Sequence, residues 1–518
     1  MQIDLANLPI DTAALQALVR LLAGDVKSKG LLIEQLKVQI AKLKRMQFGK
    51  SSEKLDSQIA QLELQLDELH EDESHAVATS PAVVQALIKE TPEKPMDKPW
   101  RKPLPDHLPR EEEVHEPSCT CPNCGGVMRK LGEDVTEILD YVPASFKVIR
   151  HVRPKLSCRI CETIVQSPMP SLPIERGRPG PGLLAHVLVA KYADHLPLYR
   201  QSGIYAREGV ELERSTLADW VGRSVALLDP LIEALRKDVL GSAVLHGDDT
   251  PVPVLAPGLG KTKTGRLWTY ARDGRPHASD QPPAAMFFYS PDRKGEHPQS
   301  HLKNFNGILH ADGYAGFNAI FETGRVTEAA CWAHVRRKFF DVHVANGSPI
   351  AKEALNKIAA LYAVEAQIKG WPPDERRRYR QDHAAPLIAD LKAWLDSALQ
   401  KLSGKSDLAG AMRYGLSRWN GLTNYIHDGR IEIDNNAAER SIRGIALGRK
   451  NYLFAGSDRG GNRAAAIYSI IETCKLNAID PEAYLRDILA CIPDHKINRL
   501  DELLPWNWAA TQQKTQTA

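Results

Sequence analysis

The chain of 518 residues is long enough for three or four domains. Its 67 Lys and Arg against 64 Asp and Glu leave a net charge of only +3, which excludes a histone-like polycation but allows local basic patches. No apolar run approaches the roughly 18 residues of a membrane span, and the start MQIDLANLP lacks the pattern of a secretory signal. Eight cysteines are too few for a disulfide framework, so we expect a protein of the reducing cytoplasm.

Residues 1–75 carry apolar side chains at heptad-compatible spacing, which predicts coiled-coil helices of the leucine-zipper type. Residues 35–54 are basic and residues 55–74 are acidic. These two runs can pair as an antiparallel hairpin within one chain or between subunits in a coiled coil. An amphipathic helix packed on the main body is a third interpretation. Residues 76–118 contain eight prolines and are expected to form an extended linker.

Two Cys-x-x-Cys pairs mark residues 119–165 as a zinc-binding module, because each pair can place two thiolates at adjacent corners of a tetrahedron. A β-hairpin at 135–152 is expected to bring the pairs together. A closed four-thiolate site has no open position for catalysis, so the module is expected to contact DNA or protein. Cys119 forms a local Cys-x-Cys-x-x-Cys and can replace one ligand. The expected ligands of one structural zinc ion are Cys121, Cys124, Cys158 and Cys161.

Residues 181–240 are helical in pattern and resemble a helix-turn-helix. A helix at 198–205 is followed by a turn containing Gly209, and Ser215 is placed to cap a second helix. Basic side chains on such a motif contact DNA phosphates. The candidates are Arg200, Arg207 and Arg214.

Residues 242–465 combine short apolar runs with later helices, which predicts a ribonuclease-H-like α/β core interrupted by a helical insertion at 350–425. A helical tail follows at 466–518. The whole chain therefore reads as a multidomain α+β protein. The expected elements of the core are strands at 243–246, 267–271 and 286–289, a helix at 301–305, and strands at 308–312 and 327–332.

Three carboxylates stand at the positions where such a core carries its chemistry. Asp248 follows the first strand, Asp312 ends the fourth, and Glu439 lies one turn into a helix that Asp434 or Asn435 can cap. Carboxylate oxygens are hard ligands suited to Mg²⁺, and two such ions about 4 Å apart assist phosphodiester displacement. Asp249 competes with Asp248, because adjacent residues of a strand face opposite sides.

Basic residues surround two of these segments. The helix that follows the fifth strand begins with Trp332 and His334 and continues with Arg336 and Arg337, so this segment is expected to position DNA near the carboxylates. For the tryptophan, packing in the core is the alternative. Further cations follow Glu439 and suit the phosphates of a bound strand. They are Arg440, Arg443, Arg449 and Lys450.

Several strings of the sequence resemble the transposases of insertion sequence family 66. They are GDDTP, HADGY, CWAHVRRKF and DNNAAERSIRGIALGRKNYLFAGS, joined by FGKSSEK, CPNCGG, CRIC, YRQSGIYAREGVELERSTLADWV and ELLPWNW along the rest of the chain. The resemblance implies a DDE-type recombinase with its triad on Asp248, Asp312 and Glu439. The family has Asp-Glu-Thr where this chain has Asp-Asp-Thr, which leaves Asp249 as a possible substitute for Asp248.

The resemblance further implies the reaction and its partners. Water would attack a phosphodiester at the terminal inverted repeats of the element, and the freed 3′-OH would attack target DNA with two Mg²⁺ ions at one centre. The expected partners are double-stranded DNA, further copies of the chain and small accessory proteins of the same element. A cytoplasmic, nucleoid-associated protein is expected. The alternative is a zinc-containing DNA-binding regulator with an inactive nuclease-like core; a junction-resolving nuclease would not need the zinc module or the coiled coil.

Overall fold

The computed structural model describes residues 170–517 apart from six single positions, together with Phe146, Val148, Ile149 and the strands β1 (Lys155–Ser157) and β2 (Ile164–Gln166). The strands β1 and β2 pair antiparallel. Among the described residues, no helix is long and apolar enough to cross a membrane. The expected coiled coil, the linker, the four zinc ligands with Cys119, and Arg449 lie outside the described residues. The six undescribed positions are 176, 178, 257, 259, 449 and 453.

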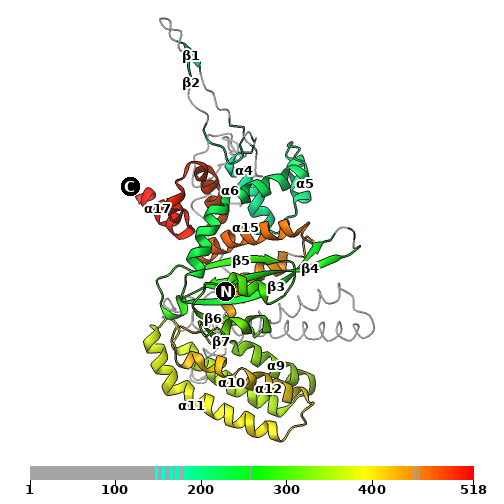
Figure 1. Cartoon of the computed structure of the whole chain (residues 1–518), viewed down its shortest axis with the longest axis vertical. Coiled ribbons are helices and arrows are strands. Elements are labelled where there is room, and N and C mark those ends of the chain that lie inside the picture. The colour runs from blue at the N-terminus through cyan, green and yellow to red at the C-terminus, as the bar shows by residue number, and fades with distance from the viewer. Residues whose placement is uncertain are drawn as a thin grey trace, which may run out of the picture. The chain divides into compact units, whose positions relative to one another are not determined.

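A five-stranded mixed sheet lies at the centre of the described chain (Figure 1). Its strand order is β5-β4-β3-β6-β7; β3 pairs antiparallel with β4 and parallel with β6, and β7 extends the parallel half. The helices α7 (Glu296–His301) and α8 (Asn318–Phe321) precede β6 and β7. The strands are β3 (Val244–Leu255), β4 (Thr262–Arg272), β5 (Ala284–Ser290), β6 (Gly307–Ala311) and β7 (Val326–Ala330).

The order of the predicted elements, three strands, a helix and two further strands, agrees with the structure, which adds α8 before the fifth strand. Two of the elements differ most from their expected bounds. The helix expected at 301–305 ends at His301, and the first strand continues to Leu255 instead of ending at residue 246. The longer strand is stabilised by its full antiparallel pairing with β4, which the apolar run alone does not reveal. Asp248 and Asp249 therefore lie within a strand.

Helices from both ends of the described chain cover the β5 edge of the sheet (Figure 1). On α15 (Asp458–Leu476), the hydroxyls of Ser469 and Thr473 accept hydrogen bonds from the backbone N–H groups of Phe287 and Ala285 on β5, at 2.9 and 3.2 Å. These bonds satisfy donors that an edge strand would otherwise expose. The expected boundary at 465–466 falls inside α15. The C-terminal helices are α16 (Pro481–Cys491) and α17 (Pro505–Thr517).

The region at 181–240 forms three helices, α4 (Pro181–Tyr192), α5 (Leu198–Arg207) and α6 (Arg214–Leu240). The expected cap at Ser215 was wrong, because α6 begins one residue earlier after Glu213 and no side chain caps it. The 27 residues of α6 bury an apolar side that includes Trp220. Its length and burial show that much of this helix serves packing rather than an exposed recognition surface.

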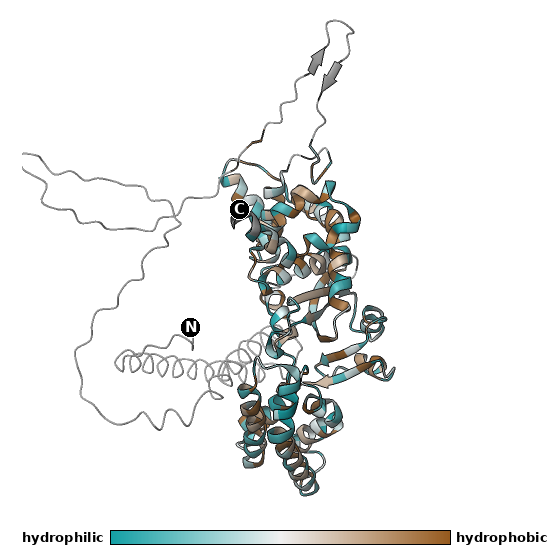
Figure 2. Ribbon diagram, turned by 90° about the vertical axis from the view of Figure 1, so that its left-hand side faces the viewer, coloured by the Kyte–Doolittle hydropathy of each residue, from teal (hydrophilic) through white to brown (hydrophobic). Residues whose placement is uncertain are grey.

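Helices occupy the insertion expected at 350–425, and together with α9 they form a bundle between β7 and α14 (Asn436–Gly448). Hydrophobic and hydrophilic residues alternate along these helices in Figure 2, as amphipathic helices that share a core require. The members are α9 (Trp332–Asn346), α10 (Pro349–Gln367), α11 (Pro373–Gln400), α12 (Asp407–Ser417) and α13 (Trp419–Thr423).

Trp332 belongs to the apolar core of this bundle, so the expectation that it positions DNA was wrong. Its side chain is 1% exposed, and its indole N–H donates to the backbone oxygen of Leu422 at 2.8 Å. The ring meets Trp419 edge to face, with 5.9 Å between centroids. A buried tryptophan whose polar atom has a partner is a packing residue.

His301, the last residue of α7, is expected to lower the stability of the protein in mild acid. His301 stacks on Phe288 with 4.3 Å between ring centroids, and burial lowers its pKa from 6.5 to about 3. The unfolded chain therefore binds this proton first. Its contribution to the free energy of unfolding is complete above pH 6.5 and falls as the pH drops, by about 1.4 kcal/mol per pH unit.

Replacing His301 by Leu should flatten the dependence of the thermal midpoint on pH between about pH 4 and 7. The same replacement at the exposed His383 should leave that dependence unchanged. Titration of all other groups is common to the three proteins. Equal slopes for His301→Leu and the unaltered chain would contradict the expectation.

Candidate active site

Asp248 and Asp312 are neighbours because of the parallel register of β3 and β6. His246 pairs with His310 in that register, and their imidazole rings stack with 4.0 Å between centroids. Side chains two residues further along each strand return to the same face. Asp248 and Asp312 follow each histidine by two positions, so both carboxylates are directed to one face just beyond the stretch in which β3 and β6 pair.

The pKa of Asp248 indicates that Glu439 lies close to Asp248 and Asp312, and these three residues are called the carboxylate group below. Burial raises the pKa of Asp248 well above its ordinary value, and the charges of Asp312 and Glu439 raise it further. The Asp248 carboxylate accepts one local hydrogen bond, from the backbone N–H of Asp249 at 2.7 Å. The charges of Asp312 and Glu439 thus add to the cost of ionising Asp248, which a bound cation would lower.

Asn435 fixes the helix that carries Glu439. Its side chain is completely buried; Nδ2 donates to the backbone oxygen of Gly247 at 2.9 Å, and Oδ1 lies 3.2 Å from Nδ1 of His246. Its backbone N–H donates to Sγ of Cys331 at 3.3 Å. One amide therefore joins the start of α14 to β3 and to the start of α9. A fully bonded buried amide specifies a single arrangement of these elements.

Of the two expected capping residues, Asp434 is the one that serves the helix. Its Oδ1 accepts the backbone N–H of Asn436 at 3.3 Å, while the side chain of Asn435 is directed to β3. Within this string, Asp434 therefore bonds to the start of the helix, and Asn435 attaches the helix to β3. Glu439 follows one turn later, with a side chain that is 19% exposed.

The carboxylate of Asp249 forms ion pairs with two arginines. Its side chain is 1% exposed, and its carboxylate is paired with Arg293 at 2.8 Å and with Arg266 at 3.0 Å. Burial raises the pKa of Asp249, and the Arg293 guanidinium opposes that shift. A carboxylate already neutralised by two guanidinium groups is a poor candidate for a metal ligand. The contacts therefore favour Asp248 over Asp249 as the strand's functional carboxylate.

Arg293 connects this ion pair to Asp312. One guanidinium nitrogen lies 3.7 Å from Oδ2 of Asp312, and the guanidinium lies over the ring of Tyr314 at 4.2 Å from its centroid. The other carboxylate oxygen of Asp312 accepts the backbone N–H of Tyr314 at 2.9 Å. Arg293 is thus a cation beside the carboxylate group, supplied by the loop that follows β5.

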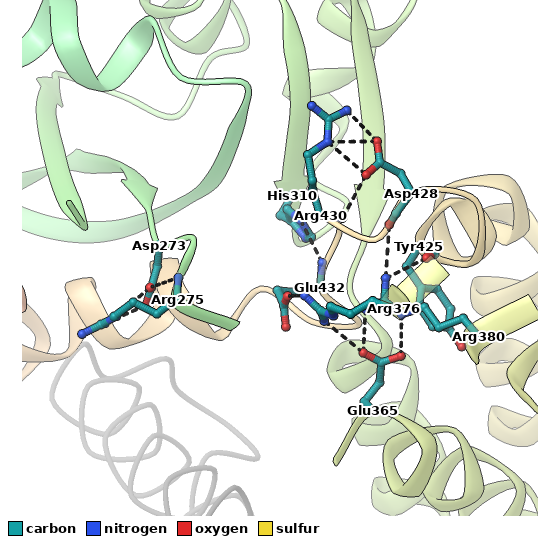
Figure 3. A network of polar contacts seen from close by, with 10 residues as sticks. All are labelled: Asp273, Arg275, His310, Glu365, Arg376, Arg380, Tyr425, Asp428, Arg430 and Glu432. Atoms are coloured by element: carbon teal, nitrogen blue, oxygen red, sulfur yellow. Dashed lines mark hydrogen bonds and ion pairs between the residues drawn. The ribbon is translucent and has the colours of Figure 1, made fainter. Parts of the chain in front are cut away.

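A buried polar network ties the helical insertion to the chain that enters α14 (Figure 3). Arg376 and Arg380 of α11 both converge on Glu365 of α10, with closest contacts of 3.3 and 2.6 Å. Arg376 also pairs with Glu432 at 2.6 Å. The backbone N–H of Glu432 donates to Nε2 of His310 at 3.4 Å, so the network reaches the histidine stack beneath the carboxylates.

Comparison with known proteins gives the family. Residues 176–463, more than half of the chain, match the model described as Transposase IS66 family. The chain belongs to this family. Residues 35–112 match Transposase C of IS166 homeodomain, residues 118–162 match the zinc-finger binding domain of transposase IS66, and residues 469–506 match the IS66 C-terminal element. The resemblance read from the sequence motifs is confirmed.

Relatives of this transposase are similar over almost their whole length. The uncharacterized protein y4hP of Sinorhizobium fredii is 45% identical over 497 residues, which cover 92% of this chain and 89% of the relative. The uncharacterized protein y4jD of the same organism is 36% identical over 502 residues, which cover 95% and 98%. The similarity therefore extends over nearly the whole of this transposase.

The basic residues expected to bind DNA lie in different parts of this IS66 transposase. Arg336 and Arg337 lie half-buried on α9, Arg443 lies half-buried on α14, and Lys450 is exposed just beyond that helix. Arg440 is exposed and pairs with Asp273 at 3.3 Å. These residues share the elements that carry or adjoin Glu439. In contrast, the exposed Arg200, Arg207 and Arg214 lie on α5 and α6, away from the elements that carry the carboxylates.

Three residues of the site were missed by sequence reasoning. Arg293 lies in a polar loop whose sequence has no motif signal, and only the folded loop brings it to Asp249 and Asp312. Asn435 stood in a recognised string but was considered only as a cap. Cys331 has no role among the sequence predictions, although the spacing Cys-x-x-His to His334 is a usable signal.

Proposed function

We propose that this IS66 transposase cleaves the ends of its element and joins the freed 3′-OH to target DNA, using Asp248, Asp312 and Glu439 on a ribonuclease-H-like core. The observation that carries the proposal is the grouping of these three carboxylates, one from each of β3, the end of β6 and α14. The strand order, with two antiparallel partners on one side of β3 and two parallel strands on the other, supports the assignment of the core.

The carboxylate group suits two Mg²⁺ ions. All of its donors are hard oxygens, the charges of Asp312 and Glu439 disfavour ionisation of Asp248, and Oε1 of Glu439 is buried without a hydrogen-bond partner among the described residues. When bound there, the ions would supply activation of the attacking oxygen and stabilisation of the leaving oxygen.

The protein's own residues have separate tasks in this proposal. Asp248 and Asp312 hold the ions from the sheet, and Glu439 completes the shell from the helix. Asn435 keeps that helix against β3, and Arg293 offsets the carboxylate charge until DNA and metal arrive. Arginine is suited to a second role here, because its guanidinium can pair with a phosphate as well as with a carboxylate.

Double-stranded DNA, both terminal inverted repeats and target, is the proposed partner. Cations beside Glu439 would contact the strand being cut, and those of α5 and α6 would contact DNA further from the cut. We assign the first group to Arg336, Arg337, Arg443, Arg449 and Lys450, and the second to Arg200 and Arg214. Residues 1–75 would join copies of the transposase through their heptads. Small accessory proteins of the same element would assist the reaction. The complex would act on the nucleoid in the cytoplasm.

The zinc-finger match supports one structural zinc ion on Cys121, Cys124, Cys158 and Cys161. Replacing Cys121 or Cys158 by Ser should remove one equivalent of zinc per chain, measured by metal analysis of protein purified without chelator. Cys119→Ser is the matched control and should keep the full zinc content. Loss of zinc from Cys119→Ser with retention in Cys121→Ser would mean that Cys119 is the ligand.

The function is tested with DNA that carries the terminal repeats of the element. The transposase should nick this DNA in Mg²⁺ and transfer the 3′ ends to a target, while Ca²⁺ should support binding without cleavage. Scrambled ends should be left intact. Specific binding with no cleavage in either metal would instead favour the alternative function, a zinc-containing DNA-binding regulator with an inactive nuclease-like core.

A further inference from the structure

A second group of metal-ligating side chains lies beside the carboxylates. Cys331 lies between β7 and α9 as the residue that precedes the helix, His334 lies in the first turn of α9, and Glu439 faces them from α14. One ligand atom from each residue lies within 4.8 Å of the other two, and Nδ1 of His334 is 4.0 Å from Oε1 of Glu439. Residues three apart at a helix start lie on the same side, so the Cys-x-x-His spacing produces this grouping directly.

Two of these ligand atoms have no hydrogen-bond partner among the described residues. Nδ1 of His334 and Oε1 of Glu439 are shielded from solvent and make no hydrogen bond within the described part of the chain. Leaving buried polar atoms unsatisfied costs stability, so such atoms call for an explanation. Sγ of Cys331 accepts the backbone N–H of Asn435 at 3.3 Å, and burial raises the pKa of this thiol, so a bound cation would be what stabilises its thiolate. The three atoms are therefore arranged as acceptors that face a common point.

The types of ligand atom indicate which metal ions this site favours. One thiolate, one imidazole and one carboxylate suit borderline-soft ions such as Zn²⁺ or Co²⁺, whereas Mg²⁺ takes oxygen ligands. Around a tetrahedral zinc ion, ligand atoms at bonds of about 2.0–2.3 Å stand roughly 3.3–3.8 Å apart. The observed separations exceed this by less than about 1.5 Å, a difference that side-chain rotation can close. Three protein ligands also leave a fourth position open.

We propose that Cys331, His334 and Glu439 bind one divalent transition-metal ion of the zinc class, at a site distinct from the zinc-finger cysteines. Glu439 would be shared with the carboxylate group. A zinc-class ion at this site would therefore withdraw Glu439 from Mg²⁺ and inhibit strand cleavage; this consequence, unlike the site itself, rests on the proposed function.

Cobalt binding to the full chain tests the site without any cleavage assay. Metal-free transposase is titrated with Co²⁺ and followed by the cobalt–thiolate absorption band, which counts the ions bound by cysteine. Cys331→Ser should bind one equivalent less than the unaltered chain. Cys474→Ser removes another fully buried thiol, and it should bind as the unaltered chain does. Equal binding by all three proteins would overturn the proposal.

A second variant covers the case in which Cys331→Ser does not fold. His334→Gln keeps every cysteine, and it should weaken this one equivalent by about tenfold or more while the remaining cobalt binds normally. Unchanged affinity in His334→Gln would overturn the proposal as well. Thermal unfolding of each variant shows whether its metal content refers to folded protein.

Zinc inhibition separates this proposal from the proposed function. If the transposase cleaves DNA, Zn²⁺ should inhibit it in competition with Mg²⁺, and Cys331→Ser should need about tenfold more Zn²⁺ for half-inhibition. Equal zinc sensitivity of the two proteins would contradict the sharing of Glu439. If no protein cleaves DNA, the proposed function fails, and the cobalt titration still decides on the metal site.

Discussion

Replacing Asp248 or Asp312 by Asn, or Glu439 by Gln, is expected to abolish strand cleavage while binding to the element ends remains. Each change keeps the size of the side chain but removes a negative charge from the group that would hold Mg²⁺. A loss of several kcal/mol of transition-state stabilisation corresponds to roughly a thousandfold in rate. Cleavage is measured on labelled end DNA, and binding by titration of the same DNA in Ca²⁺. Binding should persist or tighten, because it depends on basic side chains.

Asp249→Asn is the matched control for these three changes. The structure puts this carboxylate between Arg266 and Arg293, so its loss should lower stability more than it lowers catalysis. Measured well below the unfolding midpoint, Asp249→Asn should keep cleavage within about one hundredfold of the unaltered chain, as expected for a residue that supports a site from behind. An inactive Asp249→Asn beside an active Asp248→Asn would show that the assignment on β3 is wrong by one residue.

The sequence could locate the carboxylates because each stands next to a strong local signal. An apolar run ends directly before Asp312, and a capping string precedes the helix that carries Glu439. These signals are short-range, and the strand order that follows from them agrees with the structure. The choice between Asp248 and Asp249 needed contacts that are distant in sequence. Only the pairing of Asp249 with guanidinium groups from β4 and the loop after β5 favours its neighbour.

The wrong and missing predictions also concern contacts between residues that are distant in sequence. Trp332 precedes a basic segment, and this neighbourhood suggested a DNA contact, yet the backbone oxygen of Leu422 and the ring of Trp419 hold it in the core. The residue spacing gives no sign that Asn435 reaches across to Gly247. Packing partners across an insertion of this length are specified by tertiary structure, which local periodicity does not encode. The helical content of the insertion was nevertheless predictable, since its periodic pattern is long.

The insertion is more than a spacer between Asp312 and Glu439. Its arginines contact the backbone and side chains of the segment that leads into α14, and that segment in turn contacts His310 on β6. The position of Glu439 therefore depends on packing in a helical bundle that lies outside the sheet. This coupling makes the buried arginines of α11 the most informative stability mutants in the chain.

Arg380→Met is expected to lower the free energy of unfolding by about 3–5 kcal/mol, the usual effect of removing one partner from a buried ion pair. The Arg380 side chain is completely buried; it contacts Glu365 at 2.6 Å and donates to the backbone oxygens of Tyr425 and Asp428 at 2.8 and 3.1 Å. Methionine fills much of the volume but removes one donor from each of these acceptors and leaves Glu365 with Arg376 at 3.3 Å. The change is measured by denaturant unfolding and by the thermal midpoint.

Arg378→Met is the control, because Arg378 is exposed and its guanidinium reaches only a carbonyl of its own helix, at 3.4 Å. Its effect should stay within about 0.5 kcal/mol. Adding Glu365→Leu to Arg380→Met should restore part of the lost stability, since the buried carboxylate would no longer need a counterion. Equal stabilities of Arg380→Met and Arg378→Met would mean that the network of Figure 3 does not hold the insertion to the core. If the double variant loses more stability than the two single variants lose together, packing rather than charge accounts for the stabilising effect of the network.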